Sequence, residues 1–84
     1  MTVQQRVQRF ILDNFYVADP AELGDDTPLV DGGYVDSTGM LELIGFLEAE
    51  YGLRVGDAEM VPENLGSIAR IAAFVARKRP AAVG

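Results

Sequence analysis

The chain passes from loop to helix at Gly33-Tyr34-Val35-Asp36-Ser37, and the amphipathic run Met40-Leu41-Glu42-Leu43-Ile44-Gly45-Phe46-Leu47-Glu48 follows almost at once. The apolar spacing of that run is helical, so Ser37 lies where the helix begins. A helix start has unpaired N–H groups and the positive end of the helix dipole, and it therefore tolerates a phosphate ester well. This position predicts that Ser37 is modified by another enzyme and is not a catalyst.

The helix that starts at this serine should span residues 37–51, with Gly52 as its C-cap. At about 100° per residue, one stripe of side chains faces the core, and it consists of Met40, Leu43, Ile44, Leu47 and Tyr51. Leu41 and Phe46 lie well off that stripe, so we expect both to be exposed. Single exposed apolar residues are common in folded proteins, but these two are also suitable anchors for a partner surface.

An amphipathic helix is also predicted over residues 3–17, and Asp19-Pro20 should end it. A long connection over residues 18–36 separates it from the serine-bearing helix. The apolar side chains expected to anchor this connection to the core are Leu23, Leu29 and Val30. Loops of this length are uncommon in small domains and are often functional.

The last third of the chain predicts two further helices. One is short and lies near residues 62–65, and Ser67 can cap the other, which covers about residues 68–79. Pro80 should stop that helix, and residues 80–84 should fray. We therefore expect one domain over residues 1–84 of the all-α class: a small right-handed-connected bundle of three or four helices, with a long loop between helices 1 and 2.

The composition excludes most self-contained chemistry. The 84 residues include neither cysteine nor histidine, which removes thiolate metal sites, the commonest metal ligand and the usual general base. We therefore expect no catalytic residue and no metal site. The N-terminus has no apolar signal segment, and no apolar run is long enough to span a bilayer, so a cytoplasmic location is expected.

The charge is strongly polarised along the chain. Between Glu22 and Glu63 there are eleven acidic residues and one basic residue, Arg54, whereas the other six basic residues lie in the two ends. An acidic middle disfavours binding to nucleic acid phosphates and favours basic patches on partner proteins. Surplus acid can serve solubility alone, but solubility does not explain why the acidic residues gather around Ser37.

Other motifs around the serine fail on spacing. An EF-hand calcium loop would need an oxygen ligand where the chain has Leu29 and a glutamate where it has Thr38. The segment Asp36-Ser37-Thr38-Gly39 has one residue too many for the Asp-Thr/Ser-Gly motif of aspartic proteases. The Asp-Ser pair that remains is either a plain helix cap or a modification site.

The residues around this pair resemble the attachment region of acyl carrier proteins and peptidyl carrier domains. The similar positions are Gly33, Asp36-Ser37, Leu41-Glu42, Leu47-Glu48 and Tyr51-Gly52. Residues 62–68 and 71–75 are similar to the third and fourth helices of that family. The resemblance therefore covers essentially the whole chain, and it implies the acyl-carrier type of bundle.

The chain departs from fatty-acid carriers directly after the serine. Those carriers usually have leucine and then an acidic residue, whereas this chain has Thr38 and Gly39. We expect both to lie on the surface that modifying and loading enzymes touch. Gly45 also replaces a larger apolar residue. These departures are typical of a specialised carrier of amino acids or unusual acids, not of the housekeeping fatty-acid type.

The resemblance implies that a phosphopantetheinyl transferase attaches 4′-phosphopantetheine from coenzyme A to Ser37, with support from Asp36, and that its thiol then carries an acid as a thioester. The implied partners are that transferase, an acyl- or aminoacyl-loading ligase and downstream enzymes with basic docking patches, and a monomer suits a protein that visits them all. The positions expected to contact these partners are Thr38, Leu41, Glu42, Gly45, Phe46 and Glu48. The alternative is an acidic helical interaction module without a prosthetic group, in which the serine is only a cap.

Overall fold

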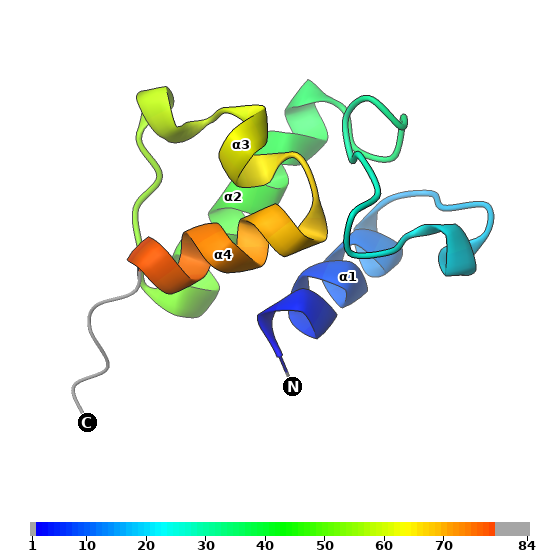
Figure 1. The fold of residues 1–84 in the computed structure, drawn as a ribbon, viewed down its shortest axis with the longest axis horizontal. Coiled ribbons are helices and arrows are strands. Elements are labelled where there is room, and N and C mark those ends of the chain that lie inside the picture. Colours follow the sequence, from blue (N-terminus) through cyan, green and yellow to red (C-terminus); the bar gives the residue numbers. More distant parts are fainter. Residues whose placement is uncertain (1, 79–84) are drawn as a thin grey trace.

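A computed structural model describes residues 2–78 and contains no β-strand among them. The helices and the two 3₁₀ turns are, in chain order, α1 (Val3–Asn14), η1 (Pro20–Glu22), α2 (Ser37–Tyr51), η2 (Asp57–Glu59), α3 (Pro62–Leu65) and α4 (Ile68–Lys78). Figure 1 shows a long connection looping out between α1 and α2, and the short α3 beside α2. Residues 2–78 form an all-α bundle with a long connection between α1 and α2, as the sequence predicts.

Helix α1 begins as a capping box and ends earlier than predicted. The Thr2 hydroxyl accepts a hydrogen bond from the Gln5 amide, and the Gln5 side chain accepts one from the Thr2 amide. The last helical residue is Asn14, so the predicted end at residue 17 is wrong. Phe15 leaves the helix in an extended conformation, with φ −130° and ψ 153°. Apolar spacing continues past Asn14, but Phe15 packs from this extended position and not from a further helical turn.

The caps of α2 and α4 match the residues that predict them. Helix α2 spans the predicted range, with Asp36 at its N-cap and Gly52 at its C-cap. Gly52 has φ 64°, a left-handed conformation that glycine adopts without a steric cost. The Ser67 hydroxyl accepts from the Arg70 amide at 3.2 Å, which confirms it as a cap of α4. The predicted end of that helix at residue 79 and the fraying of residues 80–84 lie outside the described residues.

The core lies between the three longer helices and the inner side of the connections. Its fully buried side chains come from every major element, and they are Val7, Ile11, Leu23, Leu29, Val35, Leu43, Leu47, Ile68, Ile71, Phe74 and Val75. Leu23 and Leu29 therefore anchor the long connection as predicted. Val30 does not, because it is 50% exposed. Adjacent residues in this turn point in different directions, and Leu29 takes the inward position.

Backbone hydrogen bonds hold the connection against the other end of the chain. The Leu29 amide donates to the Gly66 carbonyl at 2.9 Å, and the Ala69 amide donates to the Asp25 carbonyl at 2.9 Å. The Leu29 carbonyl in turn accepts from the amides of Tyr34 and Val35, at 2.9 and 3.0 Å. These bonds make the segment before α2 a fixed turn and thereby fix where α2 begins.

Candidate functional site

Ser37 is the first helical residue of α2, and its side chain is accessible. The residue is exposed, and its hydroxyl makes no hydrogen bond with any of residues 2–78. The cap is Asp36 instead, whose Oδ1 accepts from the Gly39 amide at 2.6 Å. The capping role that Asp and Ser could share therefore belongs to Asp36. Ser37 is left with a free nucleophilic oxygen at the positive end of a helix of 15 residues.

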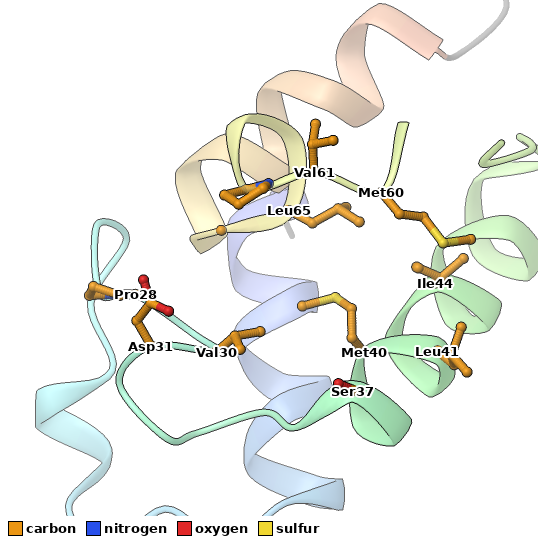
Figure 2. A pocket seen from close by; sticks show the side chains of 12 residues that line it. Pro28, Val30, Asp31, Ser37, Met40, Leu41, Ile44, Met60, Val61 and Leu65 are labelled. Atoms are coloured by element: carbon orange, nitrogen blue, oxygen red, sulfur yellow. The ribbon is translucent and has the colours of Figure 1, made fainter. Parts of the chain in front are cut away.

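An apolar pocket of about 300 Å³ opens beside this serine. Figure 2 shows Met40 of α2 and Leu65 of α3 reaching into the same space, with Ile44 one turn further along α2 and Val61 on the α3 side. Ser37 lies at the edge of the pocket, at the start of its helix. A hollow of this volume is at the lower end of the range of about 300–1,000 Å³ that small-molecule sites occupy.

The connection between α1 and α2 forms the third side of the pocket. It contributes Pro28, Val30 and Asp31. Because Val30 lines the pocket, its exposed fraction is apolar surface beside Ser37 and not simply a residue in solvent. Asp31 and Ser37 are the two polar side chains among the residues that line the pocket, so its chemistry is that of an apolar cleft with a polar edge.

The sequence analysis missed the wall contributed by α3 and the segment before it. The residues concerned are Met60, Val61, Pro62 and Leu65. Pro62-Leu65 has a helix signal of its own, which predicts α3, but no local signal places α3 opposite α2. The sequence carries no signal for Met60 either, because its role depends on exposure: it is 37% exposed in the structure, and methionine is an adaptable contact for apolar ligands.

Four of the predicted partner-contact residues lie at the surface of α2. Thr38, Glu42 and Gly45 are exposed, and Leu41 is 61% exposed. Leu41 also lines the pocket, so it links the outer face of α2 to the cleft beside Ser37. These residues are accessible to a docking protein in this structure.

The prediction that Phe46 is exposed is wrong. Its ring is half-buried and stacks on Phe10 of α1, with the ring centroids 4.5 Å apart and the planes inclined by 21°. Phe10 also packs edge-to-face against Phe15, at 6.1 Å and 69°. The stripe of α2 that meets the core is therefore wider than the periodicity indicates, because an aromatic residue of α1 covers its side.

Glu48 also has an intramolecular role that the sequence analysis did not foresee. Its Oε2 accepts from the Val55 amide at 3.0 Å, and the side chain is half-buried. The carboxylate thereby satisfies a backbone donor in the connection that follows α2. The signal is absent from the sequence, since the two residues come together only through the turn at Gly52.

Gly39 does not lie on the surface, which corrects the expectation drawn from its position after the serine. It is buried against Phe15. A Cβ at this position would stand 2.6 Å from Phe15 Cε1 and 3.0 Å from Phe15 Cζ. Position 39 is therefore a glycine because the Phe15 side chain approaches the helix backbone there. Of the two departures directly after the serine, only Thr38 is accessible to partner enzymes.

Glu59, next to Met60 of the pocket wall, is held by hydrogen bonds. Hydrogen bonds from the Gly56 amide and then from Lys78 keep the pKa of Glu59 below its usual value of 4.5. Among residues 2–78, no group of three or more acidic, histidine or cysteine side chains is placed to hold a metal ion. Nor is any helix in that part of the chain long and apolar enough to cross a membrane.

Comparisons with known proteins agree with this geometry. A family model described as a phosphopantetheine attachment site matches residues 5–75. An acyl carrier protein from Solidesulfovibrio magneticus is 29% identical over 79 residues, which cover 94% of this chain and 97% of that protein. A chain in a solved structure described as the crystal structure of an FAD-dependent dehydrogenase is 27% identical, with a TM-score of 0.68, over 87% of this chain and 97% of that one. The region that the family model matches includes Ser37 and the whole lining of the pocket.

Proposed function

The chain belongs to the phosphopantetheine attachment site family, and from this membership we propose that Ser37 receives 4′-phosphopantetheine and that the protein carries an acid as a thioester. The observation that supports this assignment most is the serine itself: its hydroxyl is exposed, unbonded within residues 2–78, and placed at the start of α2. The exposed hydroxyl gives a transferase access, and the apolar pocket beside it offers a surface for an attached group. These residues therefore fit the prosthetic group.

In the proposed modification, the Ser37 oxygen attacks the β-phosphoryl group of coenzyme A. A bond forms between that oxygen and the phosphorus, the bond to the adenosine bisphosphate part breaks, and the serine proton passes to the transferase. Positioning and charge stabilisation dominate phosphoryl transfer, so the transferase and its magnesium would supply the catalysis. The chain has no histidine and no cysteine. Its own contribution is to present the serine, and the attached group would supply the thiol.

The proposed partners approach the α2 face around this serine. Asp36 and Glu42 provide negative charge there, and Leu41 provides an apolar anchor. Isolated surface ion pairs contribute only about 0–1 kcal/mol, so we assign specificity to the combination of the apolar anchor with the acidic surroundings. Loading and processing enzymes with basic patches fit this surface. The monomeric state and the cytoplasmic location stay predictions.

An oxidising flavoenzyme is a candidate among these processing enzymes. The similar solved structure is described as an FAD-dependent dehydrogenase. Because this short chain covers 97% of the matched chain, the matched chain is itself of carrier size. We propose that a dehydrogenase of that class removes two hydrogens from the carried acid and passes them to FAD. Mixing the loaded carrier with such an enzyme should bleach the absorbance of oxidised FAD, while the unloaded carrier leaves it unchanged. An equal response to both forms would contradict this assignment.

The competing function is a helical interaction module that has no prosthetic group. It would use Leu41 and the acidic face to bind a partner, and Ser37 would be a surface residue of α2. The exposed fraction of Leu41 is the observation that favours it.

The substitution Ser37→Ala distinguishes the two functions. For a carrier, the variant stays folded but forms no thioester with a loading ligase after incubation with coenzyme A and a transferase. For an interaction module, the variant binds partners as the wild type does, and neither protein forms a thioester. Because Asp36 and not Ser37 caps α2, the variant should change the free energy of unfolding by no more than about 0.5 kcal/mol.

A further inference from the structure

We propose that Phe15 is a positioning residue for Ser37. Its ring contacts the backbone at Gly39 and thereby holds the first turn of α2 in the orientation in which the serine is modified. Any side chain at position 39 would obstruct this contact. The inference rests on the proposed function of Ser37 as the acceptor of phosphopantetheine, and it assigns a role in that modification to a residue 22 positions earlier in the chain.

The contact is between an aromatic ring and helix backbone. A Cβ at Gly39 would lie 2.6 Å from Phe15 Cε1, a separation at which one of the two groups has to move. Phe15 Cζ would lie 3.0 Å away and Asp36 Oδ1 3.1 Å away, so the two closest approaches are to the outer edge of the ring. Glycine is a poor helix former, and here it permits this approach within the first turn of α2.

The Gly39 contact lies on the other side of the helix from the serine. Residues two apart in a helix are separated by about 200° around its axis, since each step is about 100°. Phe15 therefore contacts one side of the first turn, while Ser37 lines the pocket on the other. A shift of the turn away from Phe15 would carry the serine toward the pocket. The Gly39 amide also donates to Asp36, so the cap of the helix would shift with it.

Phe15 is itself held in place by a backbone hydrogen bond and by ring packing, so it can fix the position of the first turn of α2. Its amide donates to the Ile11 carbonyl at 2.9 Å, which ends α1. Its ring packs on Phe10, and Phe10 stacks on Phe46, two turns beyond Gly39 along α2. The segment that contains Phe10 and Phe15 therefore contacts α2 at two places. Phe15 contacts the first turn at Gly39, and Phe10 contacts Phe46 two turns further along.

The test measures phosphopantetheine transfer from coenzyme A to the apo protein, with kcat and KM for each variant. Gly39→Ala should lower kcat by at least about tenfold while the protein stays folded, because a misplacement of about 1 Å can cost about 100-fold in rate. Gly39→Ala combined with Phe15→Leu should recover only part of that loss, because leucine lacks the outer ring atoms that the new Cβ meets but also lacks the ring that holds the turn. Phe15→Leu alone should therefore lower kcat as well, and a wild-type kcat for that variant would contradict the positioning role. Gly24→Ala is the matched control: its Cβ meets only Thr27 Oγ1, at 3.6 Å, and kcat should not change.

A second control separates positioning from general destabilisation. Val75 is fully buried in α4, and Val75→Ala should lower the melting temperature without lowering kcat at temperatures where the protein is folded. Amide NMR shifts of residues 36–40 in the apo protein supply a readout that needs no transferase: they should change in Gly39→Ala and return toward the wild type in the double variant.

Two further results would overturn the inference. One is a wild-type kcat for Gly39→Ala, and the other is an equal loss of kcat in Val75→Ala at a matched loss of melting temperature. If the wild-type protein itself accepts no phosphopantetheine, the proposed function fails and the inference fails with it. That outcome is distinguishable, because it affects every protein in the series.

Discussion

At the scale of single residues, the neighbours Asp36 and Ser37 have separate roles at the site. Asp36 caps α2 through a 2.6 Å hydrogen bond to the Gly39 amide, and this bond leaves the Ser37 hydroxyl available. The charge of Asp36 is also suited to attract a basic transferase surface. The cap needs only an oxygen acceptor, whereas attraction needs the negative charge, so substitutions can separate the two roles.

We predict that Asp36→Ala lowers the free energy of unfolding by about 1 kcal/mol, as expected for a lost N-cap. Asp36→Asn should keep the stability of the wild type, because asparagine caps about as well as aspartate, but it should raise the KM of the transferase for the protein. Urea unfolding and transfer kinetics measure the two effects. An equal loss of stability in both variants would show that the charge, and not the acceptor oxygen, holds the cap.

At the scale of elements, helices were predictable where their signals are local. Gly52 and Ser67 specify their caps from the sequence alone, and α2 and α3 have the predicted bounds. The end of α1 and the burial of Gly39 were not predictable, because both depend on a contact between residues far apart in the chain. The same holds for the pocket, whose α3 wall has no signal that places it beside α2.

Glu42 and Glu48 provide a comparison on one helix, because both are acidic residues of α2 with different surroundings. Glu48→Ala should lower the free energy of unfolding by about 1–2 kcal/mol, because it leaves the Val55 amide without its acceptor. Glu42→Ala should change it by less than about 0.5 kcal/mol and should instead weaken binding to a loading enzyme. Urea unfolding of the two variants measures the difference. Equal stability of both would contradict the structural role of Glu48.

The contact between η2 and α4 should make stability depend on pH. Glu59 accepts from the Gly56 amide and pairs with Lys78 at 2.9 Å, which lowers its pKa in the folded state. A carboxylate with a lowered pKa stabilises the fold at neutral pH, and this contribution is lost as the pH falls below about 4.5 toward the folded pKa. Thermal unfolding of the wild type and Glu59→Gln from neutral to acid pH should show a difference in melting temperature that shrinks below that value. A constant difference would contradict the assignment.

At the scale of the whole molecule, the pocket beside Ser37 is built mainly from the acidic segment of the chain. The segment from Glu22 to Glu63 contains eleven acidic residues and one basic residue, and all but two of the residues that line the pocket belong to it. Long-range attraction can therefore bring a basic enzyme to the correct face before apolar contacts form. The polarity along the chain can be read from the sequence, but its arrangement in space cannot: in the fold, Arg6 and Lys78 from the two ends pair with Glu50 and Glu59 of the acidic segment.

We predict that the rate constant kcat/KM for phosphopantetheine transfer falls as salt rises. Screening shortens the reach of the field from about 30 Å at 0.01 M salt to about 10 Å at 0.1 M. Transfer kinetics over that range measure the effect, with kcat at saturating protein as the control, which should change less. A kcat/KM that is independent of salt would remove steering from the account.

The most direct test of the central claim is the intact mass of the protein after incubation with coenzyme A, magnesium and a broad-specificity phosphopantetheinyl transferase, beside Ser37→Ala. We predict that the wild type gains the mass of one phosphopantetheine and that the variant gains none. A folded wild type that gains no mass with several transferases, or a variant that gains the same mass, would contradict the claim that Ser37 is the attachment site.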